Sequence, residues 1–144
     1  MKIVRLGQGA WTVYAACLTK GACPVMDFIC SLEEKRAARV LADLREFVPA
    51  TSPKHWALTE FSKLLEDGIY EFRWPAKGGG TPRVLWFFDE NRVVVCTNGA
   101  DKKKGKLSDE VMDLATDMRR NYLEAKRNGQ LRIVDADDFD SDEG

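Results

Sequence analysis

The chain carries IYEFRW at residues 69–74, RVLWFF at 83–88 and RVVVCT at 92–97. All three segments are rich in β-branched and aromatic residues, which favour strands. The linkers between them contain three glycines at 78–80 and the sequence Asp-Glu-Asn at 89–91, at distances that are typical of hairpins. The sequence therefore predicts three consecutive antiparallel strands in the middle of the chain.

Two helices are expected before these strands. Pro24 is a favourable first helical residue, and apolar residues follow it at helical spacing as far as Pro49. Ser52 and Pro53 would begin a second, shorter helix. Its apolar face would carry five residues: Ala57, Leu58, Phe61, Leu64 and Leu65. We expect the two helices to form an antiparallel hairpin.

The two ends of the chain add further elements. Residues 1–18 are expected to form one or two strands, with a break at 7–9. Ser108 would cap a C-terminal helix that ends at Gly129, and residues 131–134 would add a short strand. The predicted class is therefore α+β, with an antiparallel sheet packed against an N-terminal helical hairpin and a C-terminal helix.

A chain of 144 residues is long enough for one domain with a hydrophobic core, which we place at residues 1–134. It has 22 Lys and Arg against 23 Asp and Glu, and six of these acids lie in residues 135–144. The near balance of basic and acidic residues excludes a uniformly basic protein. Because many of the acids lie at the C-terminal end, the rest of the chain can still form a local phosphate site. The acidic segment is either a solvated, disordered tail or a segment that folds back over a basic site.

Several classes of protein are not expected. No apolar run approaches the ~18 residues that a membrane span needs, and the first six residues lack the apolar core of a signal peptide. The four cysteines form no C-x-x-C pair and His55 is the sole histidine, so the sequence predicts no zinc site. No cofactor is implied. We therefore expect a cytoplasmic protein with reduced thiols and no membrane partner.

Hairpin register brings two arginines together. A loop centred on Gly78 would make Arg73 and Arg83 direct cross-strand partners. Two cations in this arrangement cost stability, and a phosphate bound between the guanidinium groups would offset that cost. Two alternatives remain open: Glu71 or an acid of the tail neutralises the arginines, or the register differs by one residue.

A lysine-rich loop would lie at the same end of the sheet. A two-residue turn at 90–91 pairs Asp89 with Arg92 and places Asn98 opposite Arg83. The strand then leads to a run of lysines that would converge with the two arginines on one polyanion: Lys102, Lys103, Lys104 and Lys106. The alternative is a solvated loop.

An aromatic residue accompanies these cations. Trp74 follows Arg73 directly and would stack on an unpaired base, as aromatic residues do in proteins that bind single-stranded nucleic acids. Other aromatic residues of the strands are expected on the opposite face, in the core: Tyr70, Phe72, Trp86 and Phe88. The sequence thus predicts a phosphate site with a stacking partner.

The arginine and lysine motifs resemble those of a known family. The sequence is GIYEFR at 68–73, RVLWFF at 83–88 and NGADKK at 98–103, followed by Lys106. The family pattern is roughly G-L-Y-E-L-R, R-V-x-Y-F-F and H-G-F-x-K-K-x-x-K-T-P. Over about residues 11–128, the chain is similar to the phage-derived, HigB-like branch of the RelE/ParE toxin superfamily.

This resemblance implies a RelE-like fold and the toxin of a bacterial or prophage type II toxin–antitoxin module. Most RelE and HigB members cleave mRNA in the ribosomal A site without a metal. By position, four residues would be the catalytic cations: Arg73, Arg83, Lys102 and Lys103. Glu71 would be a candidate for proton transfer, since Tyr70 would point to the core. Four others would contact RNA: Lys104, Lys106, Trp74 and Asn98.

The implied partners are a helix-turn-helix antitoxin, the ribosome and mRNA. Other functions stay open at this point, because the ParE branch of the same superfamily poisons DNA gyrase instead. The chain would then be a non-catalytic growth inhibitor that binds gyrase or another host factor. A third alternative is a phage accessory protein that kept the fold and lost the activity.

Overall fold

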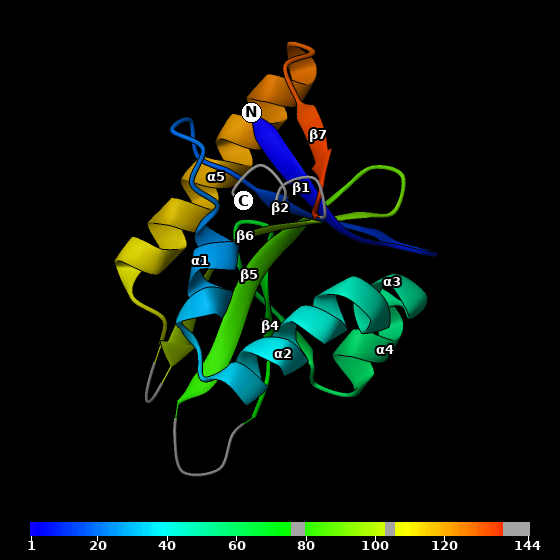
Figure 1. The fold of residues 1–144 in the computed structure, drawn as a ribbon, viewed down its shortest axis with the longest axis vertical. Coiled ribbons are helices and arrows are strands. Elements are labelled where there is room, and N and C mark those ends of the chain that lie inside the picture. The colour runs from blue at the N-terminus through cyan, green and yellow to red at the C-terminus, as the bar shows by residue number, and fades with distance from the viewer. Residues whose placement is uncertain (76–79, 103–105, 137–144) are drawn as a thin grey trace.

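The computed structural model describes residues 1–75, 80–102 and 106–136. Seven strands in this part of the chain form one mixed sheet (Figure 1). The strands are β1 (Lys2–Gln8), β2 (Thr12–Ala16), β3 (Ser62–Glu66), β4 (Ile69–Arg73), β5 (Thr81–Asp89), β6 (Val93–Lys102) and β7 (Arg132–Asp135). Their order is β3-β4-β5-β6-β2-β1-β7. Neighbours are antiparallel except for the parallel pairs β2–β6 and β1–β7.

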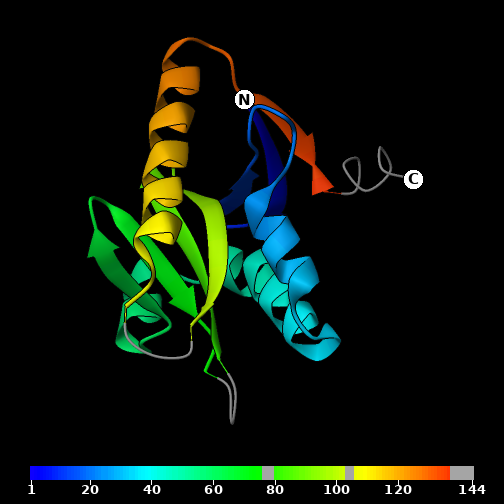
Figure 2. The ribbon, with the colours of Figure 1, turned by 90° about the vertical axis from the view of Figure 1, so that its left-hand side faces the viewer.

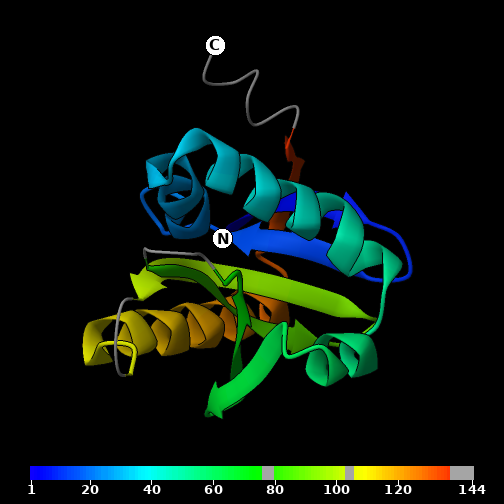
Figure 3. The ribbon, with the colours of Figure 1, turned by 90° about the horizontal axis from the view of Figure 1, so that it is seen from below.

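Helices cover both faces of this sheet. They are α1 (Pro24–Ser31), α2 (Glu34–Ala42), the π-helical segment η1 (Asp43–Phe47), α3 (Val48–Ala50), α4 (Pro53–Leu58) and α5 (Asp109–Arg127). The helices α1 and α2 lie over one face and α5 lies over the other (Figure 3). The expected α+β class is therefore confirmed.

A hydrophobic cluster on each face holds the layers together. The cluster beneath α1–α4 is rich in aromatic rings: Phe72 stacks on Trp86 with 4.6 Å between ring centroids, and Trp56 of α4 packs edge-on against both. The cluster beneath α5 includes Leu85 and Met118. Offset-stacked and edge-to-face ring pairs of this kind stabilise a core beyond the burial of apolar area alone.

Strand β4 and Trp74, which directly follows it, divide their side chains between the two faces. Phe72 and Trp74 belong to the cluster beneath α1–α4, and Ile69 belongs to the cluster beneath α5. Because side chains alternate along a strand, Glu71 and Arg73 lie on the α5 face. Trp74 therefore does not share a face with the arginines, which corrects the expectation that it stands free beside them.

The predicted first helix is present but not continuous. It breaks at Leu32, whose backbone is extended, and α2 begins with Glu34 in its first turn, where acids complement the helix dipole. Further along, Pro49 lacks an N–H and its ring excludes a regular turn at Arg45, and the chain is π-helical just before it. The carbonyl group of Arg45 then approaches Gly7 so closely that a Cβ there would collide with it.

The predicted second helix is wrong beyond Leu58. Its start is confirmed, because Ser52 Oγ accepts a hydrogen bond from the backbone N–H of His55 at 3.4 Å. The helix α4 nevertheless ends at Leu58, and Leu64 and Leu65 belong to strand β3. Helical spacing of apolar residues was thus a misleading signal in this segment.

Pairing with the next strand explains why the chain is extended there. Strand β3 pairs with β4, and the connection contains Asp67 at φ 50° and Gly68 at φ 77°. An Asp-Gly pair with positive φ at both positions is typical of a tight hairpin turn. The hydrogen bonds and side-chain contacts of a sheet outweigh the local preference for a helix. The result is an additional edge strand beside Arg73.

The turn between β5 and β6 is longer than predicted. Asn91 and Arg92 both have positive φ, at 64° and 59°, so Arg92 belongs to the turn instead of the strand. Asp89 consequently pairs with Val93. This moves the register of the whole hairpin by one residue relative to the two-residue turn that we expected.

A bulge between Val84 and Trp86 moves the register by one residue more. Arg83 therefore lies opposite Ala100, and the predicted pairing of Arg83 with Asn98 is wrong. A β-bulge adds an unpaired residue on one strand and is invisible in the hydrophobic pattern. The longer turn and the bulge together explain why Arg83 pairs two residues further along β6 than predicted.

The two ends of the chain follow the sequence prediction. Ser108 Oγ accepts a hydrogen bond from the backbone N–H of Val111 at the start of α5, and β7 returns along β1 near the N-terminus (Figure 2). Asp135 is still part of β7, whereas residues 137–144 of the predicted tail lie outside the described residues. Among the described residues, no helix has both the length and the apolar character needed to span a membrane.

Candidate functional site

The predicted pairing of the two arginines is confirmed. Arg73 of β4 lies directly opposite Arg83 of β5, and Glu71 lies opposite Leu85 two positions further along. Leu85 belongs to the hydrophobic cluster beneath α5. Because side chains alternate along a strand, Glu71, Arg73 and Arg83 lie on this same face of the sheet, just beyond the end of that cluster. The site is therefore built on two rigid strands.

Arg83 and Glu71 form a buried ion pair. Arg83 Nη1 donates to Glu71 Oε1 at 2.5 Å, and the side chains are 12% and 3% exposed. Neutralisation by Glu71 was one of the alternatives for the arginines, and it applies to Arg83. Glu71 Oε2 is buried too and accepts no hydrogen bond among the described residues, so half of this carboxylate lacks a partner.

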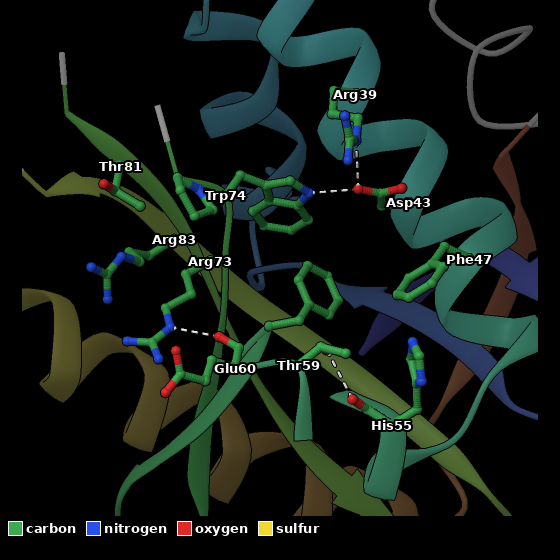
Figure 4. A pocket seen from close by; sticks show the side chains of 12 residues that line it. Arg39, Asp43, Phe47, His55, Thr59, Glu60, Arg73, Trp74, Thr81 and Arg83 are labelled. Atoms are coloured by element: carbon green, nitrogen blue, oxygen red, sulfur yellow. Dashed lines mark hydrogen bonds and ion pairs between the residues drawn. The ribbon is translucent and has the colours of Figure 1, made fainter. Parts of the chain in front are cut away.

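Arg73 is held in a different way. Its Nε donates to the backbone carbonyl of Glu60 at 2.8 Å (Figure 4). This acceptor is neutral, and within the described residues the terminal nitrogens of Arg73 form no hydrogen bond or ion pair. The terminal nitrogens are the donors that a phosphate group would engage.

These residues line a hollow of about 370 Å³ beside the start of α5, which we name the cationic hollow. Its charged residues are five cations and three carboxylates: Lys63, Arg73, Arg83, Lys102, Lys106, Glu66, Glu71 and Asp109. Neither Lys102 nor Lys106 has a hydrogen bond or ion pair from its side chain in the described part of the structure. The hollow therefore combines an excess of positive charge with unpaired donors, as an anion site requires.

A second hollow, of about 580 Å³, adjoins the same arginines and is named here the aromatic hollow. Arg73 and Arg83 line both hollows. The aromatic rings of the second hollow are Phe47, His55, Phe61 and Trp74, and Arg39, Asp43 and Glu60 add charge to its walls (Figure 4). The paired arginines thus form a border between a cationic hollow and an aromatic one.

Two side chains that were predicted to contact RNA are buried. Asn98 is 3% exposed and its amide donates to the carbonyl of Val111 at 3.1 Å, so it ties β6 to α5. Trp74 is 7% exposed and its indole Nε1 donates to Asp43 Oδ2 at 2.7 Å. Both side chains are engaged within the protein. Lys103 and Lys104 lie outside the described residues.

Other residues of the two hollows were missed at the sequence level. Lys63 and Glu66 come from β3, which the prediction assigned to a helix, and the overlooked signal was Asp67-Gly68. His55 reaches the aromatic hollow from α4, and no sequence spacing relates it to the arginines. Among the described residues, no group of three His, Cys, Asp or Glu side chains is placed to hold a metal ion.

A comparison with known families bears on this arrangement. A family model described as phage-derived protein Gp49-like (DUF891) matches residues 27–120. The chain belongs to this family. The matched range runs from α1 into α5 and includes every predicted site residue of the Gp49-like chain.

The Gp49-like family is part of the RelE/ParE-like toxins. The superfamily that the strand and loop motifs resemble is therefore confirmed, and the Gp49-like chain is a phage-derived, toxin-like protein. No curated protein matches the chain at a significant level.

Proposed function

We propose that this Gp49-like chain is the toxin of a type II toxin–antitoxin module, from the HigB-like branch, and cleaves mRNA on the ribosome without a metal. One observation carries the proposal: the cationic hollow gathers Arg73, Arg83, Lys102 and Lys106 around the buried carboxylate of Glu71. Its partners would be a helix-turn-helix antitoxin that blocks this hollow, the ribosome and mRNA, and it would act in the cytoplasm.

The proposed reaction is attack by a ribose 2′-hydroxyl on the adjacent phosphorus. The P–O5′ bond breaks and the leaving 5′-oxygen takes up a proton from water, which leaves a 2′,3′-cyclic phosphate and a 5′-hydroxyl. The phosphorane-like transition state carries extra negative charge, so that preorganised cations lower the barrier. Arg73 is suited to this role because its terminal nitrogens are unpaired in the described structure, and Lys102 and Lys106 add two further unpaired donors.

The reaction also needs a group that accepts the proton of the 2′-hydroxyl. Glu71 lines the cationic hollow, and its Oε2 has no hydrogen-bond partner among the described residues. Arg83 would hold Glu71 in place through Oε1 and thereby keep Oε2 directed to one position. In this proposal Glu71 is the proton acceptor, and Arg83 positions it while contributing charge to the phosphate.

The test is induced expression in bacteria, followed by mapping of mRNA 5′ ends in translating cells. We expect growth arrest and new ends within translated codons. Both effects should disappear in the double variant Arg73→Ala, Lys102→Ala. Unchanged toxicity in that variant would contradict the assignment of the site, and arrest without new mRNA ends would contradict the cleavage.

A second candidate is a non-catalytic inhibitor of gyrase or another host factor. Burial of Glu71 favours it, because a carboxylate that is 3% exposed and already paired with Arg83 is poorly placed to meet a ribose hydroxyl. Translation would then continue after induction, and DNA breaks would accumulate if gyrase were the target. Absence of any growth effect would instead indicate a phage accessory protein that kept the fold alone.

A further inference from the structure

Among the described residues, Arg73 and Arg83 are the only lining residues that the aromatic hollow shares with the cationic hollow. The rings of the aromatic hollow contact one another edge to face: the centroids of Phe47 and Phe61 are 5.5 Å apart and those of Phe61 and Trp74 are 5.2 Å apart. His55 continues the series, with its centroid 5.7 Å from that of Phe47. The exposed imidazole and the two half-buried phenyl rings therefore form one continuous aromatic wall.

A network of hydrogen bonds fixes the wall opposite Arg73. Asp43 Oδ2 accepts from Trp74 Nε1 at 2.7 Å and from Arg39 Nε at 3.1 Å (Figure 4). Asp43 also begins the π-helical segment η1, which ends at Phe47. Single π-helical turns occur frequently at functional sites, and here the segment supplies two residues that line the hollow. The walls are thus held in place before any ligand arrives.

The aromatic hollow has the size and chemistry of a ligand site. Its volume of about 580 Å³ lies within the range of small-molecule pockets, and its lining combines four aromatic side chains with five charged ones. Aromatic side chains beside arginines are the combination that binds unpaired bases, because a base stacks on a ring while the adjoining phosphate pairs with a guanidinium group.

We infer that the aromatic hollow binds an unpaired base of the same RNA whose phosphate lies on Arg73 and Arg83. Because these arginines border both hollows, a single strand that crosses them would place its phosphate between the hollows and a neighbouring base against Phe47 and His55. The inference rests on the proposed function and adds to it a subsite that selects nucleotides next to the cleaved bond.

The experiment measures binding of short single-stranded RNA to the full-length chain by fluorescence anisotropy. The RNA carries 2′-O-methyl groups, which block attack by the 2′-oxygen, and each position in turn is made abasic. Every oligonucleotide is used free and also placed on ribosomes. At one position, loss of the base should weaken binding by at least about five-fold, since stacking of one base contributes ~1–3 kcal/mol.

Two variants of the aromatic wall then locate the effect. His55→Ala removes an exposed ring, and Phe47→Leu keeps a partly buried apolar side chain at its position. Both should reduce the difference between intact and abasic RNA to less than about two-fold, because the stacking surface is lost. Leu58→Ala is the matched control, since Leu58 lies on α4 with His55, is 74% exposed and does not line the hollow.

The outcomes separate this inference from the proposed function. Arg73→Ala should weaken binding of intact and abasic RNA equally, because it removes a phosphate contact. If binding depends on Arg73 but no abasic position matters, or if the base effect survives in both wall variants, the inference is overturned and the proposed function stands. If neither free nor ribosome-bound RNA binds, both are overturned.

Discussion

Arg73 and Arg83 lie directly opposite each other on β4 and β5, yet their hydrogen-bond acceptors differ in charge. Arg83 pairs with the buried carboxylate of Glu71, whereas Arg73 donates to a backbone carbonyl and forms no ion pair among the described residues. Two like charges at directly paired positions destabilise a sheet. The carboxylate therefore offsets this repulsion, and the terminal nitrogens of Arg73, which have no partner among the described residues, remain to bind an anion.

The first prediction concerns Glu71→Gln. The amide keeps the shape of the side chain but removes the charge that balances Arg83, which is 12% exposed. Removal of one partner from a buried ion pair leaves an uncompensated charge, so the free energy of unfolding should fall by about 3 kcal/mol. Urea unfolding followed by circular dichroism at neutral pH measures this change.

Glu60→Gln is the control for that substitution. Glu60 adjoins the same arginines, but its contact with Arg73 uses the backbone carbonyl, which the substitution leaves intact. Its unfolding free energy should change by less than about 0.5 kcal/mol, as is usual for a surface position. Equal losses in the two variants would show that the ion pair of Glu71 has no special contribution.

The second prediction concerns the salt dependence of RNA binding. Arg73→Ala should weaken binding to single-stranded RNA and lower the slope of log K against log salt by about 0.7, the value for one phosphate contact on a single strand. Arg120→Ala removes the same charge from α5, where Arg120 is 65% exposed and lines neither hollow. Identical slopes in the two variants would mean that Arg73 touches no phosphate.

The site illustrates which relationships local sequence can predict. The pairing of Arg73 with Arg83 depends on a single hairpin whose loop centre was marked by glycines, so it could be predicted. The next hairpin contains a third turn residue and a bulge, neither of which changes the alternation of apolar residues near the turn. Asn98 was consequently misplaced by two positions, and it is buried under α5 instead of facing Arg83.

Tertiary contacts explain the other features of the structure that the sequence did not predict. Leu64 and Leu65 have helical spacing with earlier residues, but pairing with β4 draws this segment into the sheet. The aromatic hollow was beyond prediction for a similar reason. Its residues come from α2, η1, α4, the connection to β3, and the strands β4 and β5, and only the packing of the helices on the sheet brings them together.

The third prediction concerns acid stability and Asp89. Burial alone would raise the pKa of Asp89, but hydrogen bonds from Lys126 Nζ at 2.9 Å and Tyr122 Oη at 2.6 Å outweigh it and lower the pKa below 3.8. A carboxylate with a lowered pKa stabilises the fold above its ordinary pKa and loses that contribution as the pH falls through the folded-state value. Asp89→Asn should therefore cost about 1–3 kcal/mol at pH 7.

Urea unfolding at several pH values tests the sign of this effect. The difference between wild type and Asp89→Asn should shrink steadily below about pH 4, because the wild-type carboxylate then becomes protonated. Asp117→Asn is the control, since Asp117 is 56% exposed and pairs with Arg120 on the surface of α5. A difference for Asp89→Asn that is constant with pH would show that its charge does not stabilise the fold.

The fourth prediction concerns the acidic C-terminal segment, which follows β7. This strand lies at the edge of the sheet opposite β3, five strands from β4, a separation of roughly 24 Å at the usual strand spacing. Charges of a segment that stays beside β7 would be screened at physiological salt, where the Debye length is about 8 Å. Truncation after Ala136 should therefore raise RNA affinity at low salt and leave it unchanged at about 0.15 M salt.

A segment that covers the arginines would give a different result. The gain in affinity would then persist at physiological salt and would disappear when Arg73→Ala is added, because the covered charge would already be absent. The truncation site matters, since Asp135 pairs with Arg5 at 2.9 Å and belongs to β7. Truncation after Val134 should lower the free energy of unfolding by up to about 1 kcal/mol, whereas truncation after Ala136 keeps this pair and should leave stability unchanged.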